Sequence, residues 1–136
     1  MKALKAIIEK GNDNNNYGIY LPDVGGVYGF GETEQEAKEE LAEAIDSVME
    51  ELEERGYREG YEILFEEYTI EYVYDMSVFF KKYDYINVSA LARKLGINES
   101  LMRRYSSGKA YVSQEQKTEI EKGIHDIGKE LASVTF

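Results

Sequence analysis

Hydrophobic and polar residues alternate in short runs through the first part of the chain, up to residue 31. This period of two predicts β-strands at Ala3–Lys10, Tyr17–Leu21 and Val27–Gly31. Residues 11–16, GNDNNN, are turn formers, so the first two strands are expected to form a hairpin.

The period then changes to that of a helix. Thr33 and Glu36 have the spacing of a capping box, and Gly56 stands where a glycine ends a helix. Between them one apolar stripe is formed by Ala37, Leu41, Ala44, Ile45, Val48, Met49 and Leu52. The opposite face carries Glu39, Glu40, Glu43, Asp46, Glu50, Glu53 and Glu54.

Residues 68–74, YTIEYVY, alternate again and predict a fourth strand, whereas 57–67 fits either a loop or an extra strand. From residue 75 onward the pattern is helical. Four short polar residues are placed as N-caps of four helices, and these are Asp75, Asn87, Asn98 and Ser113. The last helix, about Gln114–Ala132, carries an apolar stripe of Ile120, Ile124, Ile127 and Leu131.

These elements predict an α+β protein with a βββαβ domain over residues 1–72 and an all-α domain over residues 73–136. Charge divides along a similar line. Residues 1–75 hold 6 Lys/Arg and 20 Asp/Glu, a net of −14, whereas residues 76–136 hold 10 and 7, a net of +3. Because salt screens exposed charges beyond about 10 Å, a basic segment can bind an anionic partner beside an acidic domain. Two domains with different partners are therefore expected.

Composition removes several kinds of site. The chain has no Cys and a single His, His125, so neither a disulfide framework nor a thiolate or His-based metal centre is expected. No run of 18 apolar residues and no signal peptide is visible, so we expect a cytoplasmic protein with no membrane association. We expect no cofactor and no metal.

Residues 88–108, VSALARKLGINESLMRRYSSG, carry the most specific pattern. Ala92 is small enough for two helices to touch, and Gly96 can turn the chain between them. The apolar residues that would close the wedge behind them are Leu91, Leu95, Ile97, Leu101, Met102 and Tyr105. A helical subdomain that only packs or dimerises remains the alternative.

This segment resembles the Xre/Cro phage-repressor class of helix-turn-helix domains, in which the second helix enters the major groove. By this resemblance the residues facing operator DNA would be Asn98, Glu99, Ser100, Arg103, Arg104 and Ser107. Lys109, after the glycine, suits a backbone phosphate. Arg103 and Arg104 can each form paired hydrogen bonds to guanine or phosphate. The long last helix is the expected dimerisation element, unless it only closes its own domain.

Residues 3–55 resemble the HicB antitoxin family, whose N-terminal domain has a partial RNase H-like fold. The matching positions, in order along the chain, are Tyr20, Pro22, Asp23, Gly26, Gly31, Thr33, Glu36 and Ala37. The chain departs from the family's usual run at Val24-Gly25 and Val27-Tyr28.

The resemblance implies an antitoxin that neutralises a HicA-like mRNA-cleaving toxin and represses its own operon. A homodimer or higher oligomer is expected, because a small DNA-binding unit gains affinity and specificity from two half-sites about 34 Å apart. The acidic helix face suits a cationic partner, and the candidate residues are Glu39, Glu43, Asp46 and Glu50. The alternative is a stand-alone DNA-binding regulator whose N-terminal domain binds another protein or a small ligand. A nuclease is not expected, because Asp13 and Asp23 lie in a loop and at a strand end rather than in a carboxylate cluster.

Overall fold

The computed structural model describes residues 1–10 and 16–136 and divides them into two compact units, Met1–Val78 and Phe79–Phe136. The sequence predicts the boundary between the two domains after residue 72, six residues earlier than the structure has it. The later division follows from two contacts: the Asp75 N–H donates to the Ile8 carbonyl over 2.8 Å, and Val78 is fully buried in the core of the first unit.

The N-terminal unit contains one four-stranded sheet in the order β3-β2-β1-β4. Its strands are β1 (Lys2–Lys10), β2 (Tyr17–Tyr20), β3 (Tyr28–Gly31) and β4 (Tyr68–Tyr74). β2 is antiparallel to both β1 and β3, whereas β4 is parallel to β1. A parallel pair needs a long crossover, and α1 (Glu34–Arg55) supplies it. All four predicted strands are thus confirmed, while the predicted turn at 11–16 lies, except for Asn16, outside the described residues.

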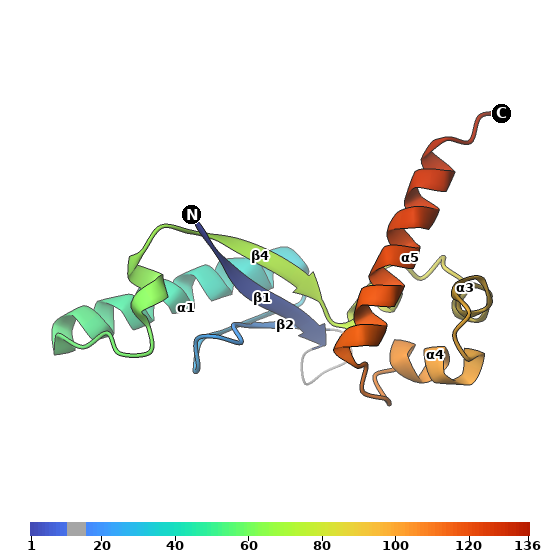
Figure 1. Cartoon of the computed structure of the whole chain (residues 1–136). Helices are drawn as coiled ribbons and strands as arrows, with labels where there is room; N and C mark the ends of the chain where they lie inside the picture. The colour runs from blue at the N-terminus through green and yellow to red at the C-terminus, as the bar shows by residue number, and fades with distance from the viewer. Residues whose placement is uncertain (11–15) are drawn as a thin grey trace. The chain divides into compact units, whose positions relative to one another are not determined.

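Helix α1 covers one face of this sheet, so that the unit has two layers (Figure 1). The predicted apolar stripe packs on the sheet, with Ala37, Leu41 and Ile45 buried. Leu4, Ala6 and Ile8 of β1 meet it from the sheet side. The apolar layer between helix and sheet is the hydrophobic core of the unit.

The ends of α1 are set by the predicted residues, with one difference. The Thr33 hydroxyl accepts from the Glu36 N–H over 3.1 Å, and Gly56 ends the helix at φ 65°. The Glu36 carboxylate, however, accepts from the N–H of Glu32 over 2.9 Å, and so caps one residue earlier than a capping box would.

Residues 57–67 form neither an open loop nor a strand, because a short 3-10 helix, η1 (Glu62–Phe65), occupies their centre. Leu64 is buried in the core and Ile63 and Phe65 pack against it. Burial of these side chains in the core therefore favours the 3-10 helix, whereas the mixed polar and apolar sequence fits either a loop or a strand.

The C-terminal unit is all helical. After α2 (Met76–Lys82), which spans the boundary, it contains α3 (Val88–Leu95), α4 (Glu99–Ser106) and α5 (Gln114–Ala132). The caps predicted at Asn87, Asn98 and Ser113 are confirmed, since each side chain accepts from a backbone N–H three residues on. The buried residues of this unit are Phe80, Leu91, Ala92, Met102, Tyr105, Val112 and Ile120.

The apolar stripe of α5 is only partly used. Ile120 is buried and Ile124 and Ile127 are half-buried, but Leu131 is 67% exposed. The helix therefore closes its own unit with its first half and leaves the apolar end of the stripe uncovered.

Candidate functional site

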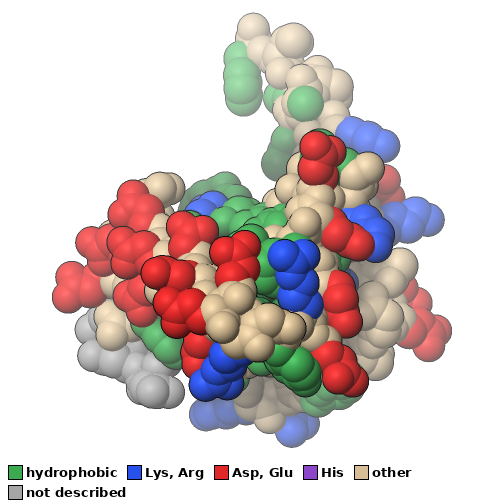
Figure 2. Space-filling model, turned by 90° about the vertical axis from the view of Figure 1, so that its left-hand side faces the viewer, with side chains coloured by type: hydrophobic (Ala, Val, Ile, Leu, Met, Phe, Trp, Pro, Cys, Tyr) green, Lys and Arg blue, Asp and Glu red, His purple; other side chains and the backbone are tan. Residues whose placement is uncertain are grey.

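The acidic residues predicted to bind a partner lie on the side of α1 away from the sheet. Glu39, Glu43, Asp46 and Glu50 are all exposed, and their spacing of three or four residues places them along one face. Figure 2 shows Asp and Glu side chains crowded on one side of the N-terminal unit. This surface would produce a strong negative field toward an approaching cation.

This acidic face has few polar contacts of its own. The Gln35 amide donates to Glu39 over 3.2 Å within the helix. At the border with β4, burial raises the pKa of Tyr68, and the nearby charge of Asp46 raises it further. The Lys38 ammonium lies 4.3 Å from the centre of the Tyr72 ring, and so its charge is directed toward the sheet. The carboxylates thus remain available to a partner.

The second candidate surface is the pair α3 and α4. Three residues, Gly96 to Asn98, join the two helices, and Gly96 adopts the left-handed conformation at φ 73°. Ala92 is completely buried, as expected for the point where the helices touch. Of the predicted wedge, Leu91, Met102 and Tyr105 are buried and the other three residues are half-buried.

The residues predicted to face DNA lie on α4 and immediately before and after it, but they differ in their surroundings. Ser100, Arg103, Arg104, Ser107 and Lys109 are exposed. Their side chains are thus accessible to solvent, and their contact with DNA stays a prediction.

Four of the predicted residues already have polar partners within the chain, namely Asn98, Glu99, Arg103 and Ser107, whose hydroxyl donates to the Arg104 carbonyl over 3.2 Å. Asn98 is exposed, but its side-chain oxygen caps α4 by accepting from the Leu101 N–H over 2.9 Å. Glu99 is half-buried and accepts from the Arg93 guanidinium over 2.6 Å, which neutralises part of its charge. The Glu99 carboxylate, whose charge would repel a DNA phosphate, is therefore paired within the chain.

A second contact links the same two helices. The Arg103 guanidinium donates to the Ser89 hydroxyl over 2.9 Å. Ser89 and Arg93 are one turn apart on α3, and Glu99 and Arg103 are one turn apart on α4, so two parallel links cross the exposed side of the pair. Ser89 and Arg93 were missed by the sequence prediction. Their four-residue spacing opposite Glu99 and Arg103 is the signal that could have found them.

Two further properties concern the described parts of the chain. No group of three or more His, Asp and Glu side chains among the described residues is placed to hold a metal ion. No helix in residues 1–10 and 16–136 is long and apolar enough to cross a membrane.

Comparison with known proteins gives a family for most of the chain. Residues 4–104 match the family model described as the HicB_like antitoxin of bacterial toxin-antitoxin systems. No curated protein and no solved structure gives a significant match. The matched range includes most of β1, all of β2, β3 and β4, the acidic helix and most of the α3–α4 pair. The chain therefore belongs to the HicB-like antitoxin family.

Proposed function

We propose that the chain neutralises a HicA-like, mRNA-cleaving toxin through its acidic N-terminal unit and represses its own operon through α3 and α4, acting as a helix-turn-helix. Family membership supports an antitoxin. The negative charge of the N-terminal unit suits a cationic toxin, and the positive charge of the C-terminal unit suits operator DNA. Both partners belong to the cytoplasm, where this function would take place.

The observation that carries the proposal is that charge and structure divide at nearly the same place. The N-terminal unit has a net charge of −14 and the C-terminal unit a net charge of +3, because residues 76–78 carry no charge. An acidic unit attracts an RNA-binding, cationic protein, since opposite fields speed encounter. A locally basic unit with exposed arginines suits phosphate, whose contacts dominate affinity for DNA.

The N-terminal unit is proposed to be non-catalytic. Its β-β-β-α-β order supports a partial RNase H-like fold, but many of its carboxylates lie on the outer face of α1, away from the sheet. RNase H chemistry needs carboxylates converging on two metal ions about 4 Å apart. Cleavage of RNA by the pure chain with Mg²⁺ would contradict this part of the proposal.

The toxin-binding part is tested by adding the pure chain to the small basic protein encoded next to it while RNA cleavage is followed. Cleavage should stop at about equal amounts of the two proteins. A variant with Glu39→Gln, Glu43→Gln, Asp46→Asn and Glu50→Gln should associate more slowly. The matched control neutralises four exposed carboxylates of α5 instead, namely Glu115, Glu119, Glu121 and Asp126.

The DNA-binding part is tested with a labelled fragment of the chain's own promoter. Arg103→Ala or Arg104→Ala should weaken binding by ~1–3 kcal/mol. Arg55→Ala serves as the control, because Arg55 pairs with Glu51 on α1 of the other unit and its loss changes net charge equally. Unchanged binding in both α4 variants would remove α4 from the interface. Promoter binding without any toxin partner would favour a stand-alone regulator.

A further inference from the structure

The face of the sheet that α1 does not cover carries a continuous row of apolar side chains. Strand register pairs Tyr28 with Tyr20, Tyr20 with Ile7, and Ile7 with Val73, so one residue from each of the four strands stands in line. Directly paired residues point to the same face of a sheet. None of the four belongs to the core cluster beneath α1.

This row ends in an exposed pair of aromatic rings at the edge strand β3. Tyr28 is 52% and Phe30 46% exposed, and their rings stack with centroids 6.2 Å apart. Phe30 lies over Gly18, where an added Cβ would come within 3.3 Å of its ring. Gly29 between them faces α1, which confirms that both rings point away from the helix.

A sheet with one solvated face normally has polar residues there. Here the solvated face has two exposed rings that continue into the half-buried Tyr20, Ile7 and Val73. Exposed apolar patches of this kind mark interaction surfaces, and buried aromatic anchors dominate the affinity of protein interfaces.

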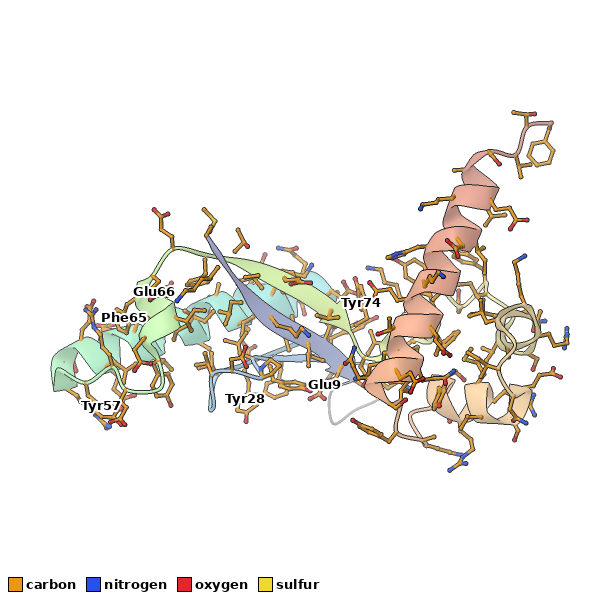
Figure 3. The ribbon with its side chains drawn as sticks, in the orientation of Figure 1. Glu9, Tyr28, Tyr57, Phe65, Glu66 and Tyr74 are labelled. Carbon is orange, nitrogen blue, oxygen red and sulfur yellow. The ribbon has the colours of Figure 1, made fainter. Side chains whose placement is uncertain are left out.

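Charge decides which partner this face suits. Glu9 lies beside Phe30 and Gly18, near the C-terminal end of β1 (Figure 3). On the same face, Lys5 of β1 and Glu71 of β4 stand opposite each other in the strand register. The whole unit has a net charge of −14. A second copy would bring the same negative charge to the face, whereas an arginine-rich surface can stack on the rings and pair with the carboxylates.

We infer that the uncovered sheet face, with Tyr28 and Phe30 as its aromatic anchors, is where the cationic toxin docks. The inference rests on the proposed toxin-binding function and names its surface. The carboxylates of α1 lie on the opposite side of the two-layer unit and act at longer range, by accelerating encounter. Surface charges mainly change association rates, and desolvated anchors mainly change dissociation rates.

The two roles are separated by measuring association and dissociation rates with the full chain and the basic protein encoded next to it. Tyr28→Ala and Phe30→Ala should each raise the dissociation rate at least tenfold and change the association rate less than threefold. The four-carboxylate α1 variant should do the reverse and lose most of its salt dependence. Tyr57→Ala is the matched control, because Tyr57 is 49% exposed and follows α1 rather than lying on the sheet.

Folding is monitored in parallel by thermal unfolding, and Tyr28→Lys provides a second variant. It keeps a long side chain at an exposed position but places a cation against a cationic partner, so binding should fall further than with Tyr28→Ala.

Three outcomes would overturn the inference. Unchanged dissociation in Tyr28→Ala and Phe30→Ala, with faster dissociation in the α1 variant, would place the toxin on the helix face. Self-association of the chain that is lost in Tyr28→Ala would assign the sheet face to a second copy. If the unchanged chain does not bind the basic protein at all, the proposed toxin-binding function fails as well.

Discussion

Two glycines of β3 set how closely α1 approaches the sheet. A Cβ added at Gly29 would meet the Ala37 carbonyl and lie 2.5 Å from the Leu41 nitrogen. A Cβ at Gly31 would lie 2.7 Å from the nitrogen of Ala37. Because these neighbours are backbone atoms of a helix, they cannot move aside as a side chain can.

Gly29→Ala is therefore expected to lower the free energy of unfolding by about 1–3 kcal/mol or more, as overpacking does. Urea unfolding measures the change. Gly25→Ala is the control. Nothing lies within 4 Å of the Cβ added there, so this substitution should change the free energy of unfolding little. Equal stability of the two variants would contradict the close packing of α1 on β3.

Glu9 gives a pH-dependent prediction at the same scale. Partial burial raises the pKa of Glu9 above its ordinary value of 4.5, and the nearby charge of Asp75 raises it further. The folded chain thus binds this proton more tightly than the unfolded chain, so its stabilising effect is complete below pH 4.5 and lost as the pH rises through the folded-state pKa.

Glu9→Gln should consequently increase stability at pH 7 by less than ~1 kcal/mol, as expected for a largely exposed charge, and give no increase at pH 4. Urea unfolding at the two pH values tests this. Glu40→Gln removes the same charge from the exposed face of α1 and corrects for the general relief of negative charge. A gain at pH 4 as large as at pH 7 would argue against the assignment to Glu9.

At the scale of elements, Asn98 has one observed role and one predicted role, which can be separated. Its side chain caps α4, and the same residue is predicted to face DNA. Asn and Asp are about equally good N-caps, whereas Ala is a poor one.

Asn98→Ala is expected to cost ~1 kcal/mol of stability through loss of the cap. Asn98→Asp should keep the stability of the unchanged chain but weaken binding to promoter DNA, because it places a carboxylate near phosphate. Thermal unfolding and DNA titration distinguish the two effects. Full DNA affinity in a folded Asn98→Asp variant would mean that this end of α4 does not approach DNA.

At the scale of the whole molecule, the sequence predicts a dimer, and the uncovered end of α5 is the candidate contact. Leu131 is 67% and Val134 51% exposed, although both continue the apolar character of the half-buried Ile124 and Ile127. A dimer would place two α3–α4 pairs, one from each copy, on DNA half-sites about 34 Å apart.

If this predicted dimer forms through α5, Leu131→Glu should shift it toward monomer in sedimentation and steepen the concentration dependence of promoter binding. Lys129→Glu, an exposed change of charge on the same helix, is the control. A dimer that persists in Leu131→Glu would exclude the end of α5 as the dimer contact.

Most of the secondary structure was predictable because its signals are local. The caps at Thr33, Asn87 and Asn98 each act within three residues, and Gly56 and Gly96 end their helices through their own backbone conformation. The 3-10 helix at Glu62–Phe65 was not predictable, because its formation depends on the burial of Leu64 beneath distant residues.

The candidate surfaces divide in the same way. Periodicity by itself determined that four carboxylates share one face of α1 and that two arginines follow each other on α4. It also determined the α+β order of the elements and, through short motifs, the resemblance to the HicB family. These properties follow from residues that are neighbours along the chain.

Only the tertiary structure decided which face of the sheet stays uncovered, and therefore that Tyr28 and Phe30 are exposed next to Gly29, which packs on α1. It likewise paired Arg103 with Ser89, fourteen residues away, on another helix. Strand order, register and helix packing join residues that are distant in sequence, and no local preference specifies which of them meet.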